Sequence, residues 1–361
     1  KPIIGPSHNT AQWELDRELG MEILRKHEIA VPKSMPFNNY DKAVEYVKKT
    51  NKRYVSKPSG DVDKALSYCS SGPADMCYML ERWKKISGRR DFILQEFISG
   101  IEMAVGGWFG PSGFVNSWCE NWEFKKLMNG DKGVATGEQG TVLRYVRRSK
   151  LAKMVLEPLT ETLEKENYLG YIDINCIIDA AGHPWPLEFT MRPGWPTFNI
   201  QQELHGSDPV QWLSELALGK DPTILDNTIA IGVVLSIPDY PYSRTTKKEI
   251  MGIPIYGITP KMIPHVHFTE VMLGEAPVDR GGKVVREKMV VSAGDYILIM
   301  TATGQTVYEA KQTVYRRLDR LQMPNSPMWR TDIGDRLSKQ LPILHKQGFA
   351  TGMEFSTNQP R

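Results

Sequence analysis

Cysteine is scarce in this 361-residue chain, which has only Cys69, Cys77, Cys119 and Cys176. No two of them have a CxxC or zinc-ligand spacing, so neither a zinc site nor a redox pair is indicated. We therefore expect free thiols in a reducing compartment, with the cytoplasm as the location. Long apolar runs are also missing. None approaches the ~18 residues that a membrane-spanning helix requires, so we expect no membrane partner.

An excess of either charge is absent as well. The chain has 45 Lys and Arg against 42 Asp and Glu, a net charge of +3. Its densest basic spots are Lys84-Lys85, Arg89-Arg90 and Arg147-Arg148. Solvated helix ends explain them more simply than a nucleic-acid surface does. Nucleic acid is therefore disfavoured as a partner, although a modified base stays open as a small-molecule substrate.

Three widespread nucleotide-binding motifs are missing too. There is no GxxxxGKS/T loop, no GxGxxG after a first strand and no set of protein-kinase motifs. A P-loop, Rossmann or kinase-type nucleotide site is therefore disfavoured. With 41% hydrophobic residues, the chain is nevertheless long enough for two or more domains with apolar cores.

The most informative stretch that is present is a predicted β-hairpin. Polar and apolar residues alternate from Gly170 to Asp179, and a second apolar strand, Trp185 to Phe189, follows an Asp-Ala-Ala-Gly turn. The hairpin would present four polar side chains to one region: Asp173, Asn175, Glu188 and Arg192. Carboxylates beside an arginine are costly to desolvate unless something uses them. On this stretch alone, a metal and phosphate site and a surface hairpin with ordinary charge pairs both remain open.

Other residues supply the parts of a nucleotide site. Lys57 ends a predicted strand before a Pro-Ser-Gly turn, and Arg17 lies on the polar side of a predicted helix, Thr10 to Lys26, with Thr10 as its N-cap. The strand from Phe92 leads into a hinge whose backbone could bind a purine, and Glu102 follows for ribose hydroxyls. With Glu188 and either Asn175 or Asp173 as hard oxygen ligands, these parts make an ATP and magnesium constellation.

The remaining segments divide into helices, strands and loops. We expect a helix over 151–166, a loop over 129–140, a helix beginning at Asp208-Pro209, and an irregular extension over 337–361. Strands over 229–237, 266–272 and 296–301 with a helix over 306–321 indicate a smaller α+β unit. His265 and His267 are expected to be structural or solvated.

In this order, the motifs resemble those of the ATP-grasp ligases, and within them the phosphoribosylamine–glycine ligase (glycinamide ribonucleotide synthetase) family. The resemblance runs from about Ile4 to about Arg336. Its motifs are Ile4-Gly5-Pro6, Val55 to Gly60, Leu94 to Glu102, Glu123 to Lys126, Gly133 to Gly140, Gly170 to Arg192, Gly232-Val233-Val234 and Arg330 to Arg336. It implies an α+β, ATP-grasp fold of two lobes that clasp ATP over 1–222, with the second lobe at roughly 52–110. A small C-terminal α+β domain over 223–336 and the extension over 337–361 would follow.

The resemblance also implies roles for individual residues. The nucleotide would be held by Arg17, Lys57, Lys64, Gln95, Glu96, Phe97, Ile98 and Glu102. Magnesium or manganese would be held by Asp173, Asn175, Glu188 and Thr190. The substrates would be contacted by Lys125, Thr136, Gly137, Trp195 and Thr197. Lys57 and Arg192 would be the catalytic residues, since both would hold phosphate or acyl-phosphate oxygens.

The chain departs from the family pattern at several places. The glycine-rich phosphate loop is replaced by Asp61 to Leu66, which has no glycine, so Lys64 would have to compensate. Thr190 stands where the family has a metal-binding asparagine. Trp195 and Thr197 stand where it has acids, and this implies an altered acceptor with more aromatic surface. The family's N-terminal α/β domain is not in the given sequence, so either it precedes Lys1 in a longer chain or this branch does without it.

Two functions follow from the resemblance. The first is an ATP-dependent carboxylate–amine ligase of the kind found in purine biosynthesis. It would join glycine or another small amino acid to phosphoribosylamine or to a nucleotide- or nucleobase-linked amine. Such an enzyme would have only small-molecule partners, as a monomer or homodimer. The alternative, which the glycine-free loop and Thr190 favour, is a catalytically weakened ATP-grasp module that acts as a nucleotide-binding sensor or scaffold.

Overall fold

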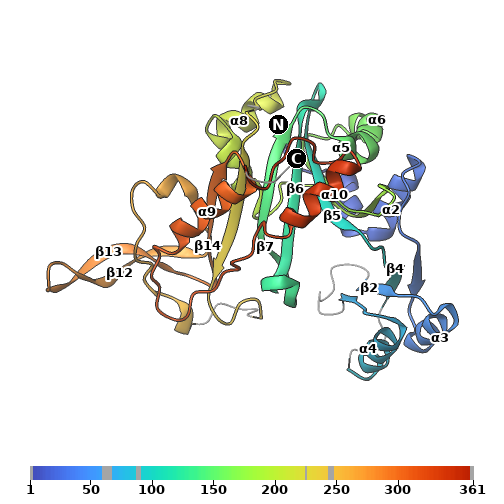
Figure 1. The fold of residues 1–361 in the computed structure, drawn as a ribbon, viewed down its shortest axis with the longest axis horizontal. Coiled ribbons are helices and arrows are strands. Elements are labelled where there is room, and N and C mark those ends of the chain that lie inside the picture. Colours follow the sequence, from blue (N-terminus) through green and yellow to red (C-terminus); the bar gives the residue numbers. More distant parts are fainter. Residues whose placement is uncertain (1–2, 59–66, 87–90, 224–225, 243–247, 358–361) are drawn as a thin grey trace. The chain divides into compact units, whose positions relative to one another are not determined.

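The computed structural model describes residues 3–58, 67–86, 91–223, 226–242 and 248–357, and the chain forms two compact units (Figure 1). The first unit comprises Lys1–Met103 and Leu151–Arg192, and the second comprises Ala104–Lys150 and Pro193–Arg361. Each unit therefore takes its residues from two separate stretches of the sequence.

The first unit holds a four-stranded antiparallel sheet and a β-hairpin. Its helices are α1 (His8–Leu15), α2 (Arg17–Lys26), α3 (Tyr40–Thr50), α4 (Pro73–Ile86) and α6 (Thr160–Lys165), with α5 (Lys150–Val155) beginning at the boundary. Its strands are β1 (Ser34–Phe37), β2 (Tyr54–Pro58), β3 (Tyr68–Cys69), β4 (Phe92–Glu96), β8 (Gly170–Ile178) and β9 (Pro184–Thr190). The sheet order is β1-β4-β2-β3, and β8 pairs with β9.

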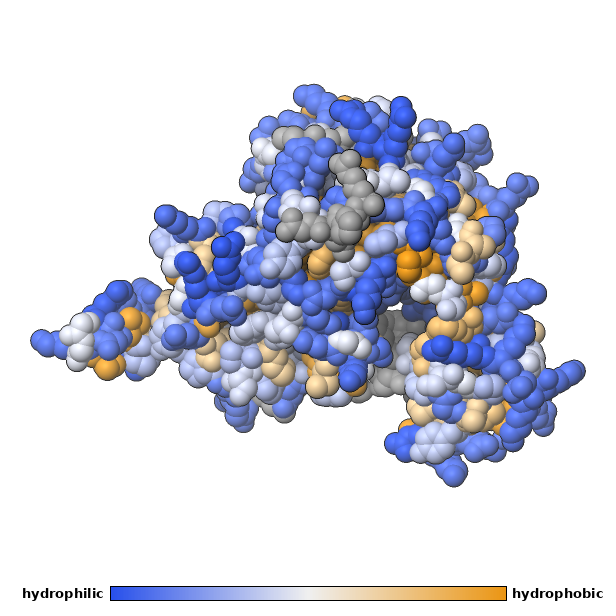
Figure 2. All heavy atoms as spheres, in the orientation of Figure 1, coloured by the Kyte–Doolittle hydropathy of each residue, from blue (hydrophilic) through white to orange (hydrophobic). Residues whose placement is uncertain are grey.

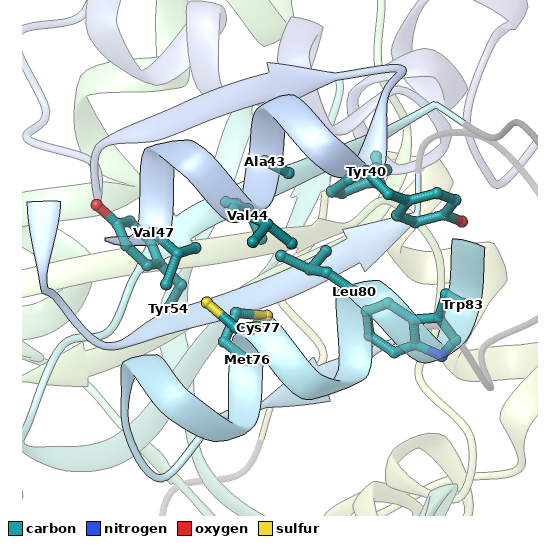
Figure 3. Packing of buried hydrophobic residues seen from close by; sticks show 11 residues of the cluster. Tyr40, Ala43, Val44, Val47, Tyr54, Met76, Cys77, Leu80 and Trp83 are labelled. Carbon is teal, nitrogen blue, oxygen red and sulfur yellow. The ribbon is translucent and has the colours of Figure 1, made fainter. Parts of the chain in front are cut away.

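Helices α3 and α4 build the core of the four-stranded sheet. Figure 3 shows their apolar side chains meeting Tyr54 of β2, and Leu80 at the centre is fully buried. Truncating such a leucine to alanine typically costs ~2–5 kcal/mol. Because alternate residues of a strand point to opposite faces, Lys57 and Gln95 lie on the face away from these helices. The sheet thus leaves one face for the helical core and one for Lys57.

The predicted helix from Thr10 to Lys26 is two helices. Asp16 interrupts it, and its carboxylate accepts hydrogen bonds from the N–H groups of Glu18 at 3.0 Å and Leu19 at 3.1 Å. The N-cap of α1 is Ser7, so the prediction of Thr10 as the cap is wrong. Arg17 is consequently the first residue of α2, where a cation is unfavourable unless a carboxylate pairs with it.

The second unit is built around a run of antiparallel strands in the order β11-β14-β10-β7-β6-β5. The strands are β5 (Ile101–Gly110), β6 (Gly113–Met128), β7 (Lys132–Val146), β10 (Ile229–Ser236), β11 (Val266–Phe268) and β14 (Tyr296–Gly304). The helices are α7 (Thr197–Gln201), α8 (Pro209–Ala217), α9 (Val307–Leu318) and α10 (Leu337–Lys346). Asp208 caps α8 with Pro209 at its first position, as predicted.

A separate two-stranded ribbon, β12 (Val271–Asp279) with β13 (Val284–Ser292), completes the second unit (Figure 1). Figure 2 shows polar and apolar residues side by side on it, and Leu273 and Val284 are exposed. Across the described residues, no helix combines the length and the apolar character that a membrane crossing needs.

Two local predictions differ from the structure, one because of polar composition and the other because of a proline. The loop expected over 129–140 is mostly strand β7, whose exposed first half shows no apolar alternation, and only the turn Asn129–Asp131 separates it from β6. The helix expected over 151–166 is α5 followed by a short 3₁₀ helix and α6. Pro158 lies in the 3₁₀ helix and lacks the N–H that a continuous α-helix would use.

The C-terminal extension, expected to be irregular, is helical and packed. Leu337, Leu341 and Leu344 of α10 are buried, although Pro342 lies inside the helix and weakened its sequence signal. Beyond it, the Thr351 carbonyl accepts a hydrogen bond of 2.9 Å from Arg144. Arg144 is buried in an ion pair with Glu120 at 2.8 Å, so the tail is anchored on β6 and β7.

Candidate nucleotide and metal site

The predicted hairpin is confirmed, and its pairing sets the polar residues side by side. Asp173 lies opposite Thr190, and Asn175 lies opposite Glu188. Directly opposed residues of an antiparallel pair share a face, with Cβ atoms ~4.5–5.5 Å apart. Since residues 173 and 175 are two apart, all four side chains occupy one face of the hairpin. We call this surface of Asp173, Asn175, Glu188 and Thr190 the metal face, after the ligand that the sequence predicts for it.

The turn of the hairpin is held by Asp179. Its carboxylate accepts hydrogen bonds of 2.9 Å from the N–H groups of Ala181 and His183 and one of 2.8 Å from the Trp185 indole. Partial burial opposes ionisation, but these donors outweigh it and lower the pKa of Asp179. The Asp-Ala-Ala-Gly signal in the sequence thus has a physical basis, because this side chain fixes the register of both strands.

A β-bulge directs the hairpin toward Lys57. The register shifts after Asn175, so that Cys176 faces Pro186 and Leu187 is the additional residue on β9. The Leu187 carbonyl accepts a long hydrogen bond of 3.4 Å from Lys57 Nζ. Lys57 and the metal face, which are far apart in sequence, therefore meet inside the first unit.

Arg17 and Glu188 form an ion pair. Arg17 Nη1 donates to Glu188 Oε2 at 2.9 Å, with side-chain exposures of 32% and 36%. The pair resolves the unfavourable charge at the start of α2. Half-exposed pairs contribute little to stability, so it is weak enough to rearrange when a ligand binds. Arg17, which is predicted to bind phosphate, thus lies beside Glu188, which is predicted to bind the metal.

Two further contacts orient the metal face. Tyr171 donates its hydroxyl hydrogen to Asp173 Oδ2 at 3.0 Å, and Asn175 Nδ2 donates to Glu102 Oε1 at 2.9 Å. Asp173 and Asn175 are each 5% exposed. Because the NH₂ group of Asn175 donates to Glu102, the amide oxygen is the atom of Asn175 that would bind a cation.

The donor set fits magnesium. Asp173 and Glu188 supply carboxylates, Asn175 an amide oxygen and Thr190 a hydroxyl, all of them hard oxygen ligands. Within the described ranges there is no cluster of three or more His, Cys, Asp or Glu that could hold a metal alone. One or two carboxylates completed by nucleotide phosphates is the usual arrangement for Mg²⁺.

Arg192 lies just past the hairpin and is bound to Glu14. Its guanidinium donates to Glu14 Oε1 at 3.0 Å, and the Met191 N–H donates to Glu14 Oε2 at 2.8 Å. Arg192 is 49% exposed at its side chain, so its guanidinium is open to solvent. Glu14 was not found by sequence reasoning, since a single acid on a helix carries no distinctive pattern.

The hinge after β4 is fixed mainly through its backbone. The N–H groups of Glu96 and Phe97 donate to the carbonyls of Lys33 at 2.8 Å and Arg53 at 3.0 Å. The Glu96 side chain binds Lys52 at 2.7 Å and lies opposite Tyr54, on the face of the helical core. It therefore points away from the face of Lys57 and Gln95. Ile98 follows in the irregular segment between β4 and β5, and Lys64 lies outside the described residues.

The predicted substrate residues of the second unit fall into a connected group. Thr136 donates its hydroxyl hydrogen to the Lys125 carbonyl at 2.8 Å, and Lys125 pairs with Glu123 at 2.9 Å. Gln139 Nε2 donates to both Thr136 Oγ1 and the Tyr240 hydroxyl at 3.2 Å. Gly137 is exposed at the strand surface. The group thus extends from β7 to the segment after β10.

Trp195 joins this group through two tyrosines that the sequence did not point to. The Trp195 ring lies 6.1 Å from the Tyr296 ring, which lies 5.6 Å from the Tyr240 ring. Thr197 is buried at the first position of α7 and contributes packing there. Tyr240 and Tyr296 come from distant stretches, so only the fold brings them together.

Residues 16–197, half of the chain, match the family described as Phosphoribosylglycinamide synthetase, ATP-grasp (A) domain. Among curated relatives, the phosphoribosylamine–glycine ligase of Streptococcus pneumoniae is 26% identical over 352 residues, covering 93% of this chain and 78% of that protein. The same enzyme of Salmonella typhimurium is 24% identical over 351 residues, covering 92% and 77%.

A solved structure gives the same result at the level of fold. The crystal structure of phosphoribosylamine–glycine ligase from Thermotoga maritima superimposes with a TM-score of 0.70 at 21% identity, covering 91% of this chain and 81% of that one. The mixed α+β architecture is therefore that of the ATP-grasp fold, and the fold-class prediction is confirmed.

Proposed function

Because the chain belongs to the phosphoribosylglycinamide synthetase ATP-grasp family, we propose that it is an ATP-dependent carboxylate–amine ligase that uses Mg²⁺. Its carboxylate substrate is glycine or another small amino acid, and its acceptor is phosphoribosylamine or a related amine. The relatives named phosphoribosylamine–glycine ligase, which align with more than nine-tenths of the chain, support the choice of these two substrates.

The observation that carries the proposal is the register of the hairpin. Asn175 opposite Glu188, next to Asp173 opposite Thr190, gives one face of oxygen ligands with Arg17 at 2.9 Å from Glu188. A surface hairpin with ordinary charge pairs does not require Lys57 of another sheet to reach the Leu187 carbonyl. Cations and oxygen ligands around one point are what a metal-bound polyphosphate needs.

Each residue has a role that follows from its position. Glu188, Asp173 and Asn175 hold the metal, which when bound neutralises charge on the phosphates. Lys57 and Arg17 hold phosphate oxygens, and Arg17 does so after leaving Glu188. The hinge backbone at Glu96–Ile98, together with Gln95 and Glu102, holds the nucleoside. Positioning and charge neutralisation of this kind supply most of the catalysis in phosphoryl transfer.

The reaction has two steps. The carboxylate of the amino acid attacks the γ-phosphorus of ATP, and ADP leaves to give an acyl phosphate. The amine nitrogen then attacks the acyl carbon, phosphate leaves, and loss of the amine proton gives the amide. Arg192, open to solvent at the end of the metal strand, is suited to hold the acyl-phosphate oxygens. No covalent nucleophile of the protein is needed.

The test is ADP release measured over a panel of amino acids and amines. We expect release that depends on both glycine and phosphoribosylamine, with the amide identified by mass spectrometry. ADP release that is indifferent to the amine would contradict the ligase. Turnover that survives Glu188→Ala would contradict the metal assignment separately.

A nucleotide-binding sensor or scaffold is the second candidate. The Arg17–Glu188 pair favours it, because this pair neutralises the main metal carboxylate. Thr190, a weaker ligand than a carboxylate or amide, also favours it. Nucleotide binding by calorimetry without turnover on any substrate pair would select this function over the ligase.

We further propose a cytoplasmic location and a monomer or homodimer. All four cysteines are free thiols, which is typical of a reducing compartment. Cell fractionation and light scattering would test the location and the oligomeric state.

A further inference from the structure

Three aromatic residues of the second unit form what we call the aromatic wall: Trp195, Tyr240 and Tyr296. The Trp195 ring is tilted by 44° to Tyr296, and Tyr296 is tilted by 69° to Tyr240. Trp195 is 50% exposed, whereas the two tyrosines are only partly exposed. A half-exposed tryptophan backed by two rings is an organised surface for a flat ligand rather than a core side chain.

Hydrogen bonds connect the aromatic wall to the predicted substrate residues. Tyr240 accepts from Gln139, which also donates to Thr136, and Thr136 in turn donates to the Lys125 carbonyl. In sequence, Trp195 follows the metal-binding strand β9 by only five residues. The aromatic wall is therefore linked to the substrate residues by bonds and to the metal strand by the chain.

Two buried acids are next in sequence to residues of the aromatic wall or of its hydrogen-bond network. Glu138 and Asp295 are 6% and 8% exposed, next in sequence to Gln139 and Tyr296. Burial raises the pKa of Tyr240, its hydrogen bonds with Thr136 and Gln139 lower it, and the Asp295 and Glu138 carboxylates raise it. Because both acids are buried, the surface that the aromatic wall offers to a ligand is aromatic rather than charged.

Building on the proposed ligase function, we propose that the aromatic wall binds the ring of an amine acceptor of the nucleobase class. The amine to be acylated is carried on that ring or its substituent. The flat ring stacks on Trp195, which is the most exposed of the three side chains. A sugar phosphate without an aromatic ring offers nothing to stack on Trp195.

Calorimetry on the full chain tests the proposal without requiring turnover. The probes are 5-aminomethyl-2′-deoxyuridine, whose base has a primary amine, and 2-aminoethyl phosphate, which has no ring. We expect Trp195→Ala to weaken binding of the first about 5- to 150-fold, as loss of base–aromatic stacking does, and to leave the second within about twofold. Trp195→Phe should retain part of the affinity. Tyr242→Ala removes a 67% exposed tyrosine two residues from Tyr240, and this control should have no effect.

Equal weakening of both probes, or none, by Trp195→Ala would overturn the proposal. ADP release with glycine and each amine then separates it from the ligase function. If the chain turns over phosphoribosylamine and Trp195→Ala does not weaken binding of the ring, the proposed role of the aromatic wall is wrong and the ligase function stands. Ring binding that depends on Trp195, with no ADP release from any amine, supports the aromatic wall and overturns the ligase.

Discussion

The metal face of the hairpin and the aromatic wall belong to one family fold but differ in physical character. On the metal face, carboxylates accept hydrogen bonds of 2.9–3.0 Å, and the Arg17–Glu188 ion pair is about one-third exposed. At the aromatic wall, rings lie 5.6–6.1 Å apart, and neighbouring acids are almost fully buried. Polyphosphate chemistry requires ions, so the metal face keeps its charged groups. Recognition of the acceptor requires only a complementary surface, so the side chains of the aromatic wall can differ from those of relatives.

The largest expected effect comes from removing the charge at the centre of the metal face. Glu188→Gln keeps the shape of the side chain but loses the carboxylate, and we expect kcat for ADP release to fall about 10²–10³-fold. Steady-state kinetics at several Mg²⁺ concentrations would measure this. Stability should change little, because the Arg17–Glu188 pair is about one-third exposed.

Glu22→Gln on α2 is the matched control, since it removes an exposed acid from the same helix as Arg17. It should leave kcat unchanged. An equal loss of kcat in Glu188→Gln and Glu22→Gln would mean that net charge, rather than a metal ligand at position 188, sets the rate. The metal face would then not differ from the aromatic wall in its need for specific charges.

Lys57→Met should weaken nucleotide binding by about 10- to 100-fold, because the ammonium that faces the hairpin would be lost. Calorimetric titration with ADP and Mg²⁺ would measure the dissociation constant. Lys49→Met in the last turn of α3 is an exposed control and should bind normally. An unchanged affinity for ADP in Lys57→Met would contradict the assignment of Lys57 to the nucleotide site.

How far the sequence predicts these two regions depends on how local their determinants are. The hairpin follows from alternation and a turn whose carboxylate bonds its own loop, all within about twenty residues. The pairing of Arg17 with Glu188 joins positions 171 residues apart, and no local pattern encodes it. The site residues were reached through the family resemblance, and their roles remain predictions.

The aromatic wall was only partly predictable for the same reason. Trp195 departs from the family pattern and was therefore conspicuous, whereas Tyr240 and Tyr296 are ordinary tyrosines until the fold joins them. Strand β7 escaped prediction because its exposed residues are glycine and polar side chains, which are equally frequent in loops. Exposed strands and long-range contacts are where local sequence patterns carry the least information.

Tyr171→Phe tests how finely the metal face is tuned. The variant removes one hydroxyl that donates to Asp173 Oδ2 at 3.0 Å and preserves the ring. Groups that orient a metal ligand typically change metal affinity ~10–100-fold. We expect the low end, about tenfold in the Mg²⁺ concentration for half-maximal ADP release, because Asp173 is not the only carboxylate. Trp195→Ala should leave this value unchanged, and a shift in it would show that the two regions are not independent.

The smallest expected effect concerns His205, in the aromatic surroundings next to α7. Its ring stacks on Trp212 at 4.2 Å, and burial lowers the pKa of His205 to about 3. Between about pH 3 and 6.5 the unfolded chain therefore binds a proton at this residue that the folded chain does not. Stability from this group is thus complete above about pH 6.5 and is lost as the pH falls toward 3, by at most ~1.4 kcal/mol per pH unit.

Replacing that histidine by phenylalanine keeps the stacking ring and removes the titration. Urea unfolding of wild type and His205→Phe at pH 5, 6, 7 and 8 would give the difference in free energy at each pH. At pH 8 both chains are neutral here, so any difference reports packing and the lost Tyr145 hydrogen bond alone. Below pH 6.5 the variant should lose stability less steeply than wild type. Parallel curves would mean that His205 takes up its proton in the folded state, and the interior around Trp212 would then be as tolerant of charge as the metal face.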